Sequence, residues 1–150
     1  MIKPKRLGHV VLRVRDLERS EEFYTGFLGL EVKGRAGDSM VFFRSNQDVD
    51  HDLAIAKIAG DAPGPEPTRV GMYHLAYEFD SIDDLIEAYR LVNEKGIRIA
   101  GYGDHGDIKG LYILDPDGIE IELCAPAPEH EGTPLEEVLS GASAKSPVSG

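Results

Sequence analysis

Two histidines, each at the head of an alternating apolar segment, are the first residues of chemical interest in this 150-residue chain. His9 and His74 open the two segments, and they lie 74 − 9 = 65 residues apart. Two imidazoles and one carboxylate form a ligand set for Fe, Mn, Ni or Zn that leaves coordination positions open for a substrate. Glu120 and Glu122 share one face of a later alternating segment, and either glutamate could complete the set.

The elements that must position these residues occur in the same order twice. The first half predicts a helix that begins after Asp16 and ends near Gly29, and the second half predicts one between Asp80 or Ser81 and Gly96. The alternating stretches predict strands over 7–14, 30–36, 39–44 and 51–58, and again over 72–79, 97–101, 110–114 and 119–124.

This repetition predicts two tandem β-α-β-β-β modules in one domain over residues 1–126, with module one at 5–58 and module two at 72–125. The intervening residues 59–71 contain three prolines and three glycines and predict a linker. The fold class is therefore α+β, with a curved mixed sheet around a metal cleft. From residue 127 to residue 150 the composition shifts to Pro, Glu, Ala, Ser and Gly, and we expect a mobile tail there.

Charge and composition narrow the classes of partner. Sixteen Lys and Arg against 27 Asp and Glu give a formal charge of −11, so we expect no binding to nucleic acid or to anionic membranes. The single cysteine, Cys124, cannot form an intrachain disulfide, and no apolar run reaches the roughly 18 residues of a membrane span. These features predict a cytoplasmic protein.

The most specific pattern runs from Gly103 to Glu122. Gly-Asp-His105 is followed after five residues by Leu-Tyr112, after two more by Asp-Pro-Asp-Gly118, and after three more by Glu122. The Asp-Pro-Asp-Gly segment alone predicts only a turn between two strands. The whole spacing resembles the signature of type I extradiol ring-cleavage dioxygenases in the vicinal oxygen chelate superfamily, also called the glyoxalase/bleomycin resistance/dioxygenase superfamily. The two modules resemble that superfamily over about residues 5–125.

The resemblance implies roles for particular residues. The metal ligands would be His9, His74 and Glu122. His51, which opens a His-Asp-x-Ala segment, would be the acid-base catalyst, and His105 and Tyr112 would hydrogen-bond the substrate and the metal ligands. Residue type alone leaves other interpretations open, because His51 lies among aspartates and fits an exposed turn, His105 fits a loop, and Tyr112 fits the core.

The activity that the resemblance implies is Fe(II)-dependent cleavage of a catechol-type ring with O2 as co-substrate. Mn, Ni or Zn could occupy the same ligands in the isolated protein. Relatives of this class often have four modules, whereas this chain has two, so we expect the tail or a second subunit of a homo-oligomer to cover the cleft.

Two other functions fit the same modules. One is a metal-dependent lyase, isomerase or epimerase such as glyoxalase I, which usually places a fourth, acidic ligand on the last strand of the first module. Subtracting the repeat, 122 − 65 = 57, puts that position near Lys57, and the strand 53–58 has no acidic residue. The other is a non-catalytic small-molecule binding protein, which would not need two imidazoles and a carboxylate.

Overall fold

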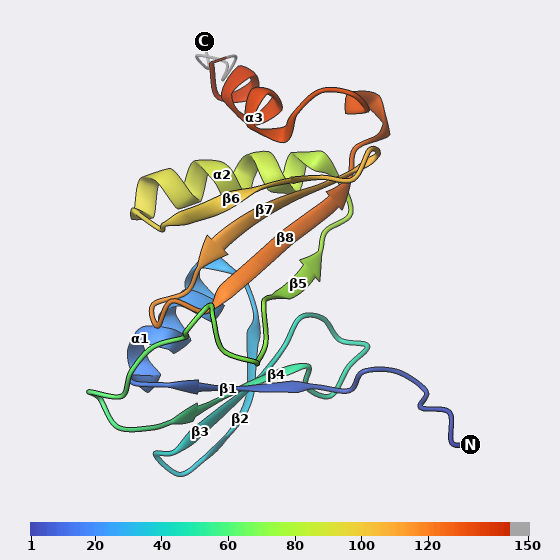
Figure 1. The fold of residues 1–150 in the computed structure, drawn as a ribbon. Helices are drawn as coiled ribbons and strands as arrows, with labels where there is room; N and C mark the ends of the chain where they lie inside the picture. Colours follow the sequence, from blue (N-terminus) through green and yellow to red (C-terminus); the bar gives the residue numbers. More distant parts are fainter. Residues whose placement is uncertain (145–150) are drawn as a thin grey trace. The chain divides into compact units, whose positions relative to one another are not determined.

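The computed structural model describes residues 1–144 of the chain (Figure 1). The chain divides into two compact units, Met1–Gly64 and Pro65–Gly150. The division between the units falls inside the segment 59–71, whose prolines and glycines predict a linker. Each unit is described by itself below.

The first unit forms one four-stranded mixed sheet. Its strands occur in the order β1-β4-β3-β2, with β1 and β4 parallel and the other neighbours antiparallel. Its elements are β1 (Val10–Val14), α1 (Leu17–Glu22), the π-helical turn η1 (Phe23–Phe27), β2 (Glu31–Ala36), β3 (Met40–Arg44) and β4 (Leu53–Lys57). The four strands predicted from the alternation are therefore all present.

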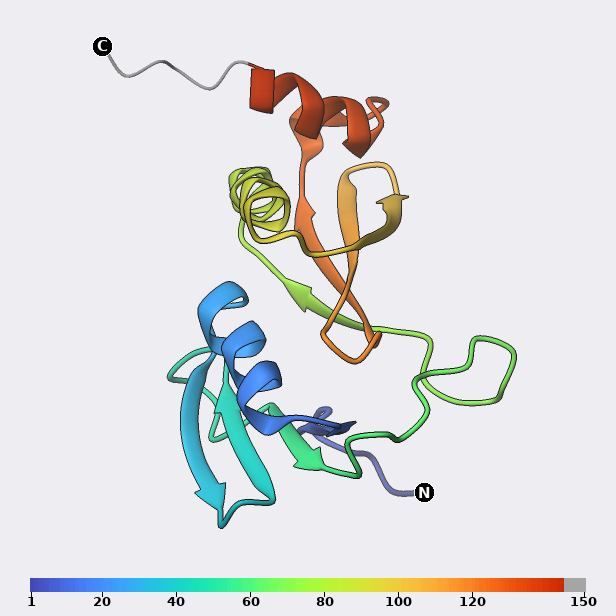
Figure 2. The same cartoon turned by 90° about the vertical axis from the view of Figure 1, so that its left-hand side faces the viewer.

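Local sequence explains these elements. Leu12 and Val14 of β1 are buried, whereas Val11 between them is 46% exposed, as the alternation predicts. Helix α1 begins at Asp16, whose side chain accepts a hydrogen bond of 3.0 Å from the backbone N–H of Arg19. The chain leaves the following η1 turn through Gly29, which has a φ of +74° that favours glycine. In Figure 2 the helical segment lies along one face of the sheet.

The second unit repeats this topology. Its strand order is β5-β8-β7-β6, again with the first and last strands of the module parallel and the other neighbours antiparallel. Its elements up to the last strand are β5 (Leu75–Glu78), α2 (Ile82–Lys95), β6 (Ile99–Asp104), β7 (Ile108–Leu114) and β8 (Glu120–Pro126). The identical order in both units confirms the predicted α+β fold of two β-α-β-β-β modules.

Helix α2 begins and ends at residues that its sequence marks. Ser81, not Asp80, caps its start, where the Asp84 carboxylate accepts a 3.2 Å hydrogen bond from the Ser81 N–H. Gly96, with a φ of +69°, ends it. Leu85 and Val92 are buried along the helix. Among residues 1–144, no helix is long and apolar enough to cross a membrane.

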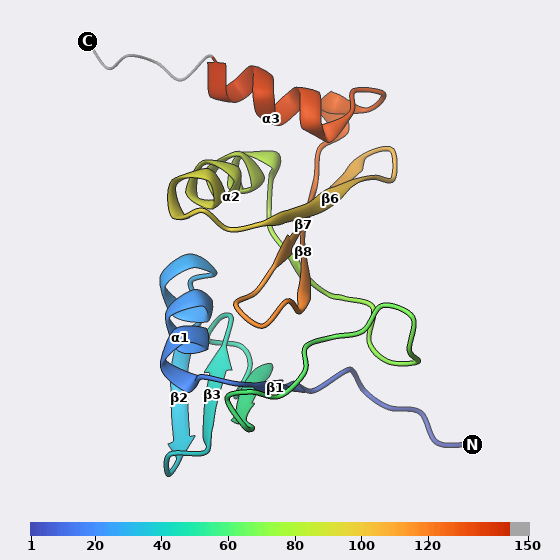
Figure 3. The same cartoon turned by 60° about the vertical axis from the view of Figure 1, so that its left-hand side comes forward.

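The segment after residue 126 differs from the mobile tail that its composition predicts. Two further helices follow β8, namely the 3₁₀ turn η2 (Pro128–His130) and α3 (Leu135–Ala144). Leu135, Val138 and Leu139 recur at helical spacing and are buried where α3 packs on α2, β6 and β7 (Figure 3). This apolar stripe explains the correction, because three well-spaced residues suffice to dock a helix in an otherwise small and polar segment. Residues 145–150 of the predicted tail lie outside the described part.

The packing of α3 makes a prediction about stability. We expect Leu139→Ala to lower the free energy of unfolding by about 2–5 kcal/mol, because it removes a fully buried side chain and leaves a cavity. Urea unfolding of the full chain measures this loss. Ser140→Ala, at an exposed neighbour on the same helix, is the matched control and should change the free energy by less than about 0.5 kcal/mol. Equal, small effects of both substitutions would support a tail that contributes nothing to the fold.

Candidate functional site

Strand pairing in the first unit brings His9 and His51 together. Strands β1 and β4 run parallel with Val10 opposite Leu53, and the Val10 N–H donates a 3.1 Å hydrogen bond to the carbonyl of Asp52. The segments that precede the two strands are therefore neighbours as well. The ring centroids of His9 and His51 lie 4.6 Å apart, so the first unit holds two imidazoles side by side at the same end of its sheet.

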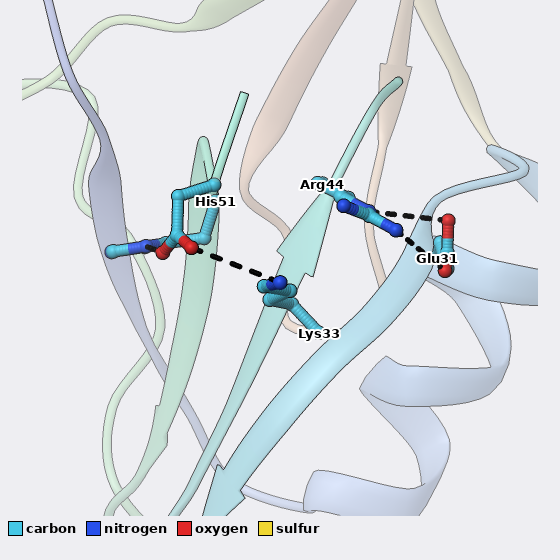
Figure 4. Close-up of polar contacts among 5 residues, drawn as sticks. Glu31, Lys33, Arg44 and His51 are labelled. Atoms are coloured by element: carbon cyan, nitrogen blue, oxygen red, sulfur yellow. Dashed lines mark hydrogen bonds and ion pairs between the residues drawn. The ribbon is translucent and has the colours of Figure 1, made fainter. Parts of the chain in front are cut away.

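A charged cluster on the first sheet surrounds His51. Asp50 Oδ2 lies 2.8 Å from His51 Nδ1, and Asp50 Oδ1 lies 3.8 Å from Lys33 Nζ (Figure 4). The hydrogen bond from His51, with help from Lys33 and Arg44, holds the pKa of Asp50 below its usual range. Because an ionised carboxylate only accepts hydrogen bonds, the proton between Asp50 and His51 belongs to Nδ1, and in the neutral ring Nε2 is then the acceptor nitrogen.

The second unit repeats the arrangement with different chemistry. Leu75 lies opposite Ile121 in the parallel pair of β5 and β8, which brings His74 beside the start of β8. His74 Nδ1 lies 3.3 Å from Glu120 Oε2, and its Nε2 lies 3.8 Å from Glu122 Oε2. Nδ1 is buried and makes no hydrogen bond of good geometry. The His74 ring therefore has one glutamate toward each of its nitrogens.

Tyr112 completes this group. It lies directly opposite Glu122 in the β7–β8 ladder, and its ring centroid is 5.2 Å from that of His74 at a steep angle. Burial raises the pKa of Tyr112 to about 12, with further contributions from its hydrogen bond to Glu122 and from the charge of that carboxylate. Tyr112 is therefore a neutral phenol at physiological pH and donates to Glu122.

His105 lies at the end of β6 in the second unit. It occupies the exposed turn between β6 and β7, where its backbone N–H donates to the carbonyl of Ile108 over 2.9 Å. Tyr112 is paired with Gly101, and its hydroxyl oxygen would be 2.9 Å from a Cβ atom at Gly103, two residues before His105. The structure therefore brings together His74, Glu122 and Tyr112 in this unit, with His105 in the turn that follows Gly103.

Strand register corrects the position of the first-module counterpart of Glu122. Glu122 lies opposite Ala76 in the second unit, and the matching residue pair in the first unit is Val11 and Ala54. The counterpart is thus Ala54 and not Lys57, because the modules are not of equal length between their first and last strands. Ala54 is fully buried and carries no carboxylate, so the described first unit still offers no acidic ligand at this position.

His74 and Glu122 are donor types that a divalent metal ion takes. Two adjacent ligand atoms that are each about 2.1 Å from one ion lie about 3.0–3.4 Å apart, so the 3.8 Å between His74 Nε2 and Glu122 Oε2 would have to shorten by about 0.5 Å on metal binding. A metal-bound histidine commonly directs its other nitrogen at a carboxylate, as Nδ1 of His74 does toward Glu120. Among residues 1–144, no three His, Cys, Asp or Glu side chains gather as a complete metal site.

Two residues with a place in these groups are not among those the sequence motif assigns. Asp50 contacts His51 Nδ1, and its position directly before that histidine is the sequence signal for this contact. Glu120 faces the second nitrogen of His74, although the sequence offered it only as an alternative metal ligand. The sequence shows the residue type and position of both carboxylates, but only the side-chain contacts in the folded sheet show which nitrogen each one faces.

The described residues form two β-α-β-β-β modules, each with a histidine directly before its first strand. The model of one family, the Glyoxalase/Bleomycin resistance protein/Dioxygenase superfamily, matches residues 6–123. The chain belongs to this superfamily.

Several curated relatives are dioxygenases by name. Biphenyl-2,3-diol 1,2-dioxygenase 3 of Rhodococcus globerulus is 31% identical over 118 residues, which are 79% of this chain and 62% of that protein. Catechol-2,3-dioxygenase of Bacillus subtilis is 32% identical over 81% of this chain and 42% of its own length. This chain thus spans about two fifths to slightly under two thirds of these dioxygenases. A lactoylglutathione lyase of Escherichia coli O157:H7 is 28% identical over 79% of this chain and 90% of the lyase.

Solved structures share the fold. A glyoxylase/bleomycin resistance protein/dioxygenase domain from Frankia sp. EAN1pec superimposes with a TM-score of 0.69 at 24% identity, over 83% of this chain and 99% of that one. A glyoxalase/dioxygenase from Nostoc punctiforme gives a TM-score of 0.69 at 23% identity, over 84% and 96%. At this identity the likeness shows the fold.

The Asp50–His51 contact predicts the tautomer of His51. We expect nitrogen-15 NMR of the neutral ring to show the proton on Nδ1 in the unsubstituted protein, because ionised Asp50 accepts it. Asp50→Asn removes the charge and should shift the population toward the Nε2–H form. Asp48→Asn, at an exposed carboxylate two residues away, is the matched control and should leave the spectrum unchanged. An Nε2–H tautomer in the unsubstituted protein would contradict this assignment.

Proposed function

We propose that this protein is an Fe(II)-dependent extradiol dioxygenase that cleaves the ring of a catechol-type substrate, with His9, His74 and Glu122 as metal ligands. The observation that carries the proposal is the grouping of His74, Glu122 and Tyr112 on one face of the second sheet. Tyr112 and Glu122 belong to the Gly103–Glu122 pattern that resembles the dioxygenase signature, and His74 comes 112 − 74 = 38 residues before Tyr112. Relatives at about 30% identity that are named as dioxygenases of aromatic diols support the same activity.

The donors present suit iron. Neither described unit by itself gathers three acidic, histidine or cysteine ligands, and the proposed set takes His9 from the first unit and His74 with Glu122 from the second. A bound Fe(II) would supply electron transfer between a diol and O2. Glu120, facing Nδ1 of His74, would hold the ring orientation and direct Nε2 to the metal side.

His51 is the proposed acid-base residue. With its Nδ1 proton held by Asp50, its Nε2 carries the lone pair and can accept a proton from a substrate hydroxyl. The ring of His9, with its centroid 4.6 Å away, puts this base beside a proposed metal ligand. Asp50 is a positioning residue in this scheme, because it acts through His51.

Tyr112 has a different part. Its raised pKa keeps the phenol protonated, so it serves as a hydrogen-bond donor and not as a base. By donating to Glu122 it fixes the direction of that carboxylate beside His74. His105, in the exposed turn that follows β6, is the proposed second hydrogen-bonding residue for the substrate.

The first prediction of this proposal concerns activity. Protein reconstituted anaerobically with Fe(II) should consume O2 when given a one-ring or two-ring catechol and should form a yellow ring-opened product in equal amount. An oxygen electrode and an absorbance spectrum recorded together measure both. Glu122→Ala, which removes a proposed ligand, is the inactive control. Iron-loaded protein that consumes no O2 with any diol of the panel would contradict the dioxygenase activity.

A second prediction separates His51 from the metal ligands. His51→Phe should retain iron, measured by elemental analysis, and should lose about 100-fold or more in kcat, because the group that accepts the proton is gone. Arg44→Lys, at a charged residue of the same surface cluster that pairs with Glu31, is the control for a change near His51 and should retain activity. Near-normal turnover in His51→Phe would exclude His51 as the acid-base residue.

A metal-dependent lyase is the second candidate function. The observation that favours it is coverage, because this chain spans 90% of the length of the lactoylglutathione lyase it matches. Buried Ala54 at the counterpart of Glu122 disfavours it, since the expected fourth, acidic ligand is missing there. Robust turnover of a hemithioacetal by zinc- or nickel-loaded protein, without O2 uptake on catechols, would establish the lyase instead.

A further inference from the structure

Two glycines lie directly opposite each other beneath the proposed site residues of the second unit. Gly103 of β6 pairs with Gly110 of β7. A Cβ atom at Gly110 would be 2.7 Å from Oε1 and 3.2 Å from Cδ of Glu122. A Cβ at Gly103 would be 2.9 Å from both Cε2 and the hydroxyl oxygen of Tyr112. The absence of a Cβ atom therefore leaves room for the Glu122 side chain at Gly110 and for the Tyr112 side chain at Gly103.

Backbone conformation does not require glycine at either position. Neither Gly103 nor Gly110 is among the described glycines with positive φ, so an alanine could adopt the same backbone. Alanine also loses less conformational freedom than glycine when a strand forms. What glycine supplies at both positions is therefore space, and the space is filled by Glu122 and Tyr112.

We propose that Gly110 and Gly103 are positioning residues, with Gly110 seating the carboxylate of Glu122 and Gly103 seating the ring of Tyr112. The inference rests on the proposed function, because it takes Glu122 as a metal ligand. It adds that the ligand geometry of this chain depends on two backbone positions that carry no chemistry of their own.

The crowding around Glu122 explains why its carboxylate cannot simply turn aside. Glu122 is only 9% exposed, its oxygens contact Tyr112 and lie near His74, and the strand face beneath it is closed by Gly110. A methyl group at position 110 must push the carboxylate away from the sheet and out of its present direction. Functional groups need placement to within about 0.5 Å, so a displacement of this size matters for a metal ligand.

The test uses Zn²⁺ alone and the full chain, with calorimetry to measure the dissociation constant. Gly110→Ala should weaken zinc binding by about 10-fold or more, the size of effect seen when a group that orients a metal ligand is lost. Gly101→Ala is the matched control, because Gly101 also lies on β6 and an added Cβ there would meet nothing within 4 Å. It should change zinc affinity by less than about two-fold.

Gly103→Ala tests the other half of the proposal. Because its Cβ would meet the Tyr112 ring and not the carboxylate, zinc affinity should fall less than in Gly110→Ala. In iron-loaded protein it should instead raise the catechol KM several-fold. Equal losses of zinc affinity in all three glycine variants would indicate a general disturbance of the β6–β7 hairpin and would overturn the assigned seats.

A double substitution identifies the contact itself. In Glu122→Asp the shorter side chain withdraws the oxygen that the new Cβ would meet, so adding Gly110→Ala should cost little further zinc affinity. The melting temperature of the metal-free protein gives a second readout. Any decrease in melting temperature caused by Gly110→Ala should largely disappear when Glu122 is also replaced by alanine, because the carboxylate atoms that the new Cβ would meet are then absent. Additive effects in both cycles would overturn the proposal.

The outcomes also separate this inference from the function on which it rests. If the unsubstituted protein binds zinc and Gly110→Ala binds it equally well, Gly110 does not position Glu122, although the proposed metal site is supported. If the unsubstituted protein binds no zinc, the metal site and the inference fail together. Weaker binding in Gly110→Ala with unchanged binding in Gly101→Ala supports both.

Discussion

The parallel pairing of the first and last strands in each module is the constraint on which the candidate site depends. In a β-α-β-β-β unit these strands are neighbours although more than 40 residues separate them, as the pairs Val10–Leu53 and Leu75–Ile121 show. Parallel strands also place their starting residues at the same end of the sheet. A histidine just before the first strand therefore meets whatever precedes or begins the last one. This geometry gives His9 its contact with His51, and His74 its contact with Glu120.

Sequence predicts the elements well because their signals are local. The alternation of β1, the cap at Asp16 and the glycine ending α2 each depend on a few neighbouring residues, and each occurs as expected. The register between modules is not local. Counting by the repeat gave Lys57 as the counterpart of Glu122, but the paired strands are 53 − 10 = 43 residues apart in one unit and 121 − 75 = 46 in the other. The difference of three residues moves the counterpart to Ala54.

Helix α3 and the contacts of Asp50 and Glu120 with the histidine rings cannot be predicted from the sequence, for related reasons. A stripe of Leu135, Val138 and Leu139 is helical in spacing but stands in a segment whose overall composition is typical of a loop, so composition outweighed periodicity. For the carboxylates, residue type and position were visible, but which atom faces which ring nitrogen depends on side-chain packing. Asp50 toward Nδ1 of His51, and Glu120 toward Nδ1 of His74, are contacts that only the folded sheet defines.

The two units divide the chemistry unequally although their topology is the same. The strand position that carries Glu122 in the second unit carries Ala54 in the first, and the position of Tyr112, opposite Glu122, is matched by Phe42, opposite Ala54. Leu53 and Ile121 are the matching first paired residues of the last strands, and the residue two positions before them is His51 in the first unit and Ile119 in the second. Each module thus keeps its leading histidine and varies what lies across from it. The first module has a second imidazole, His51, that contacts Asp50. The second module has a carboxylate, Glu122, that lies opposite the phenol of Tyr112. A duplicated fold can in this way present an imidazole and a carboxylate at related positions, because strand pairing fixes where a side chain lies and leaves its residue type free to change.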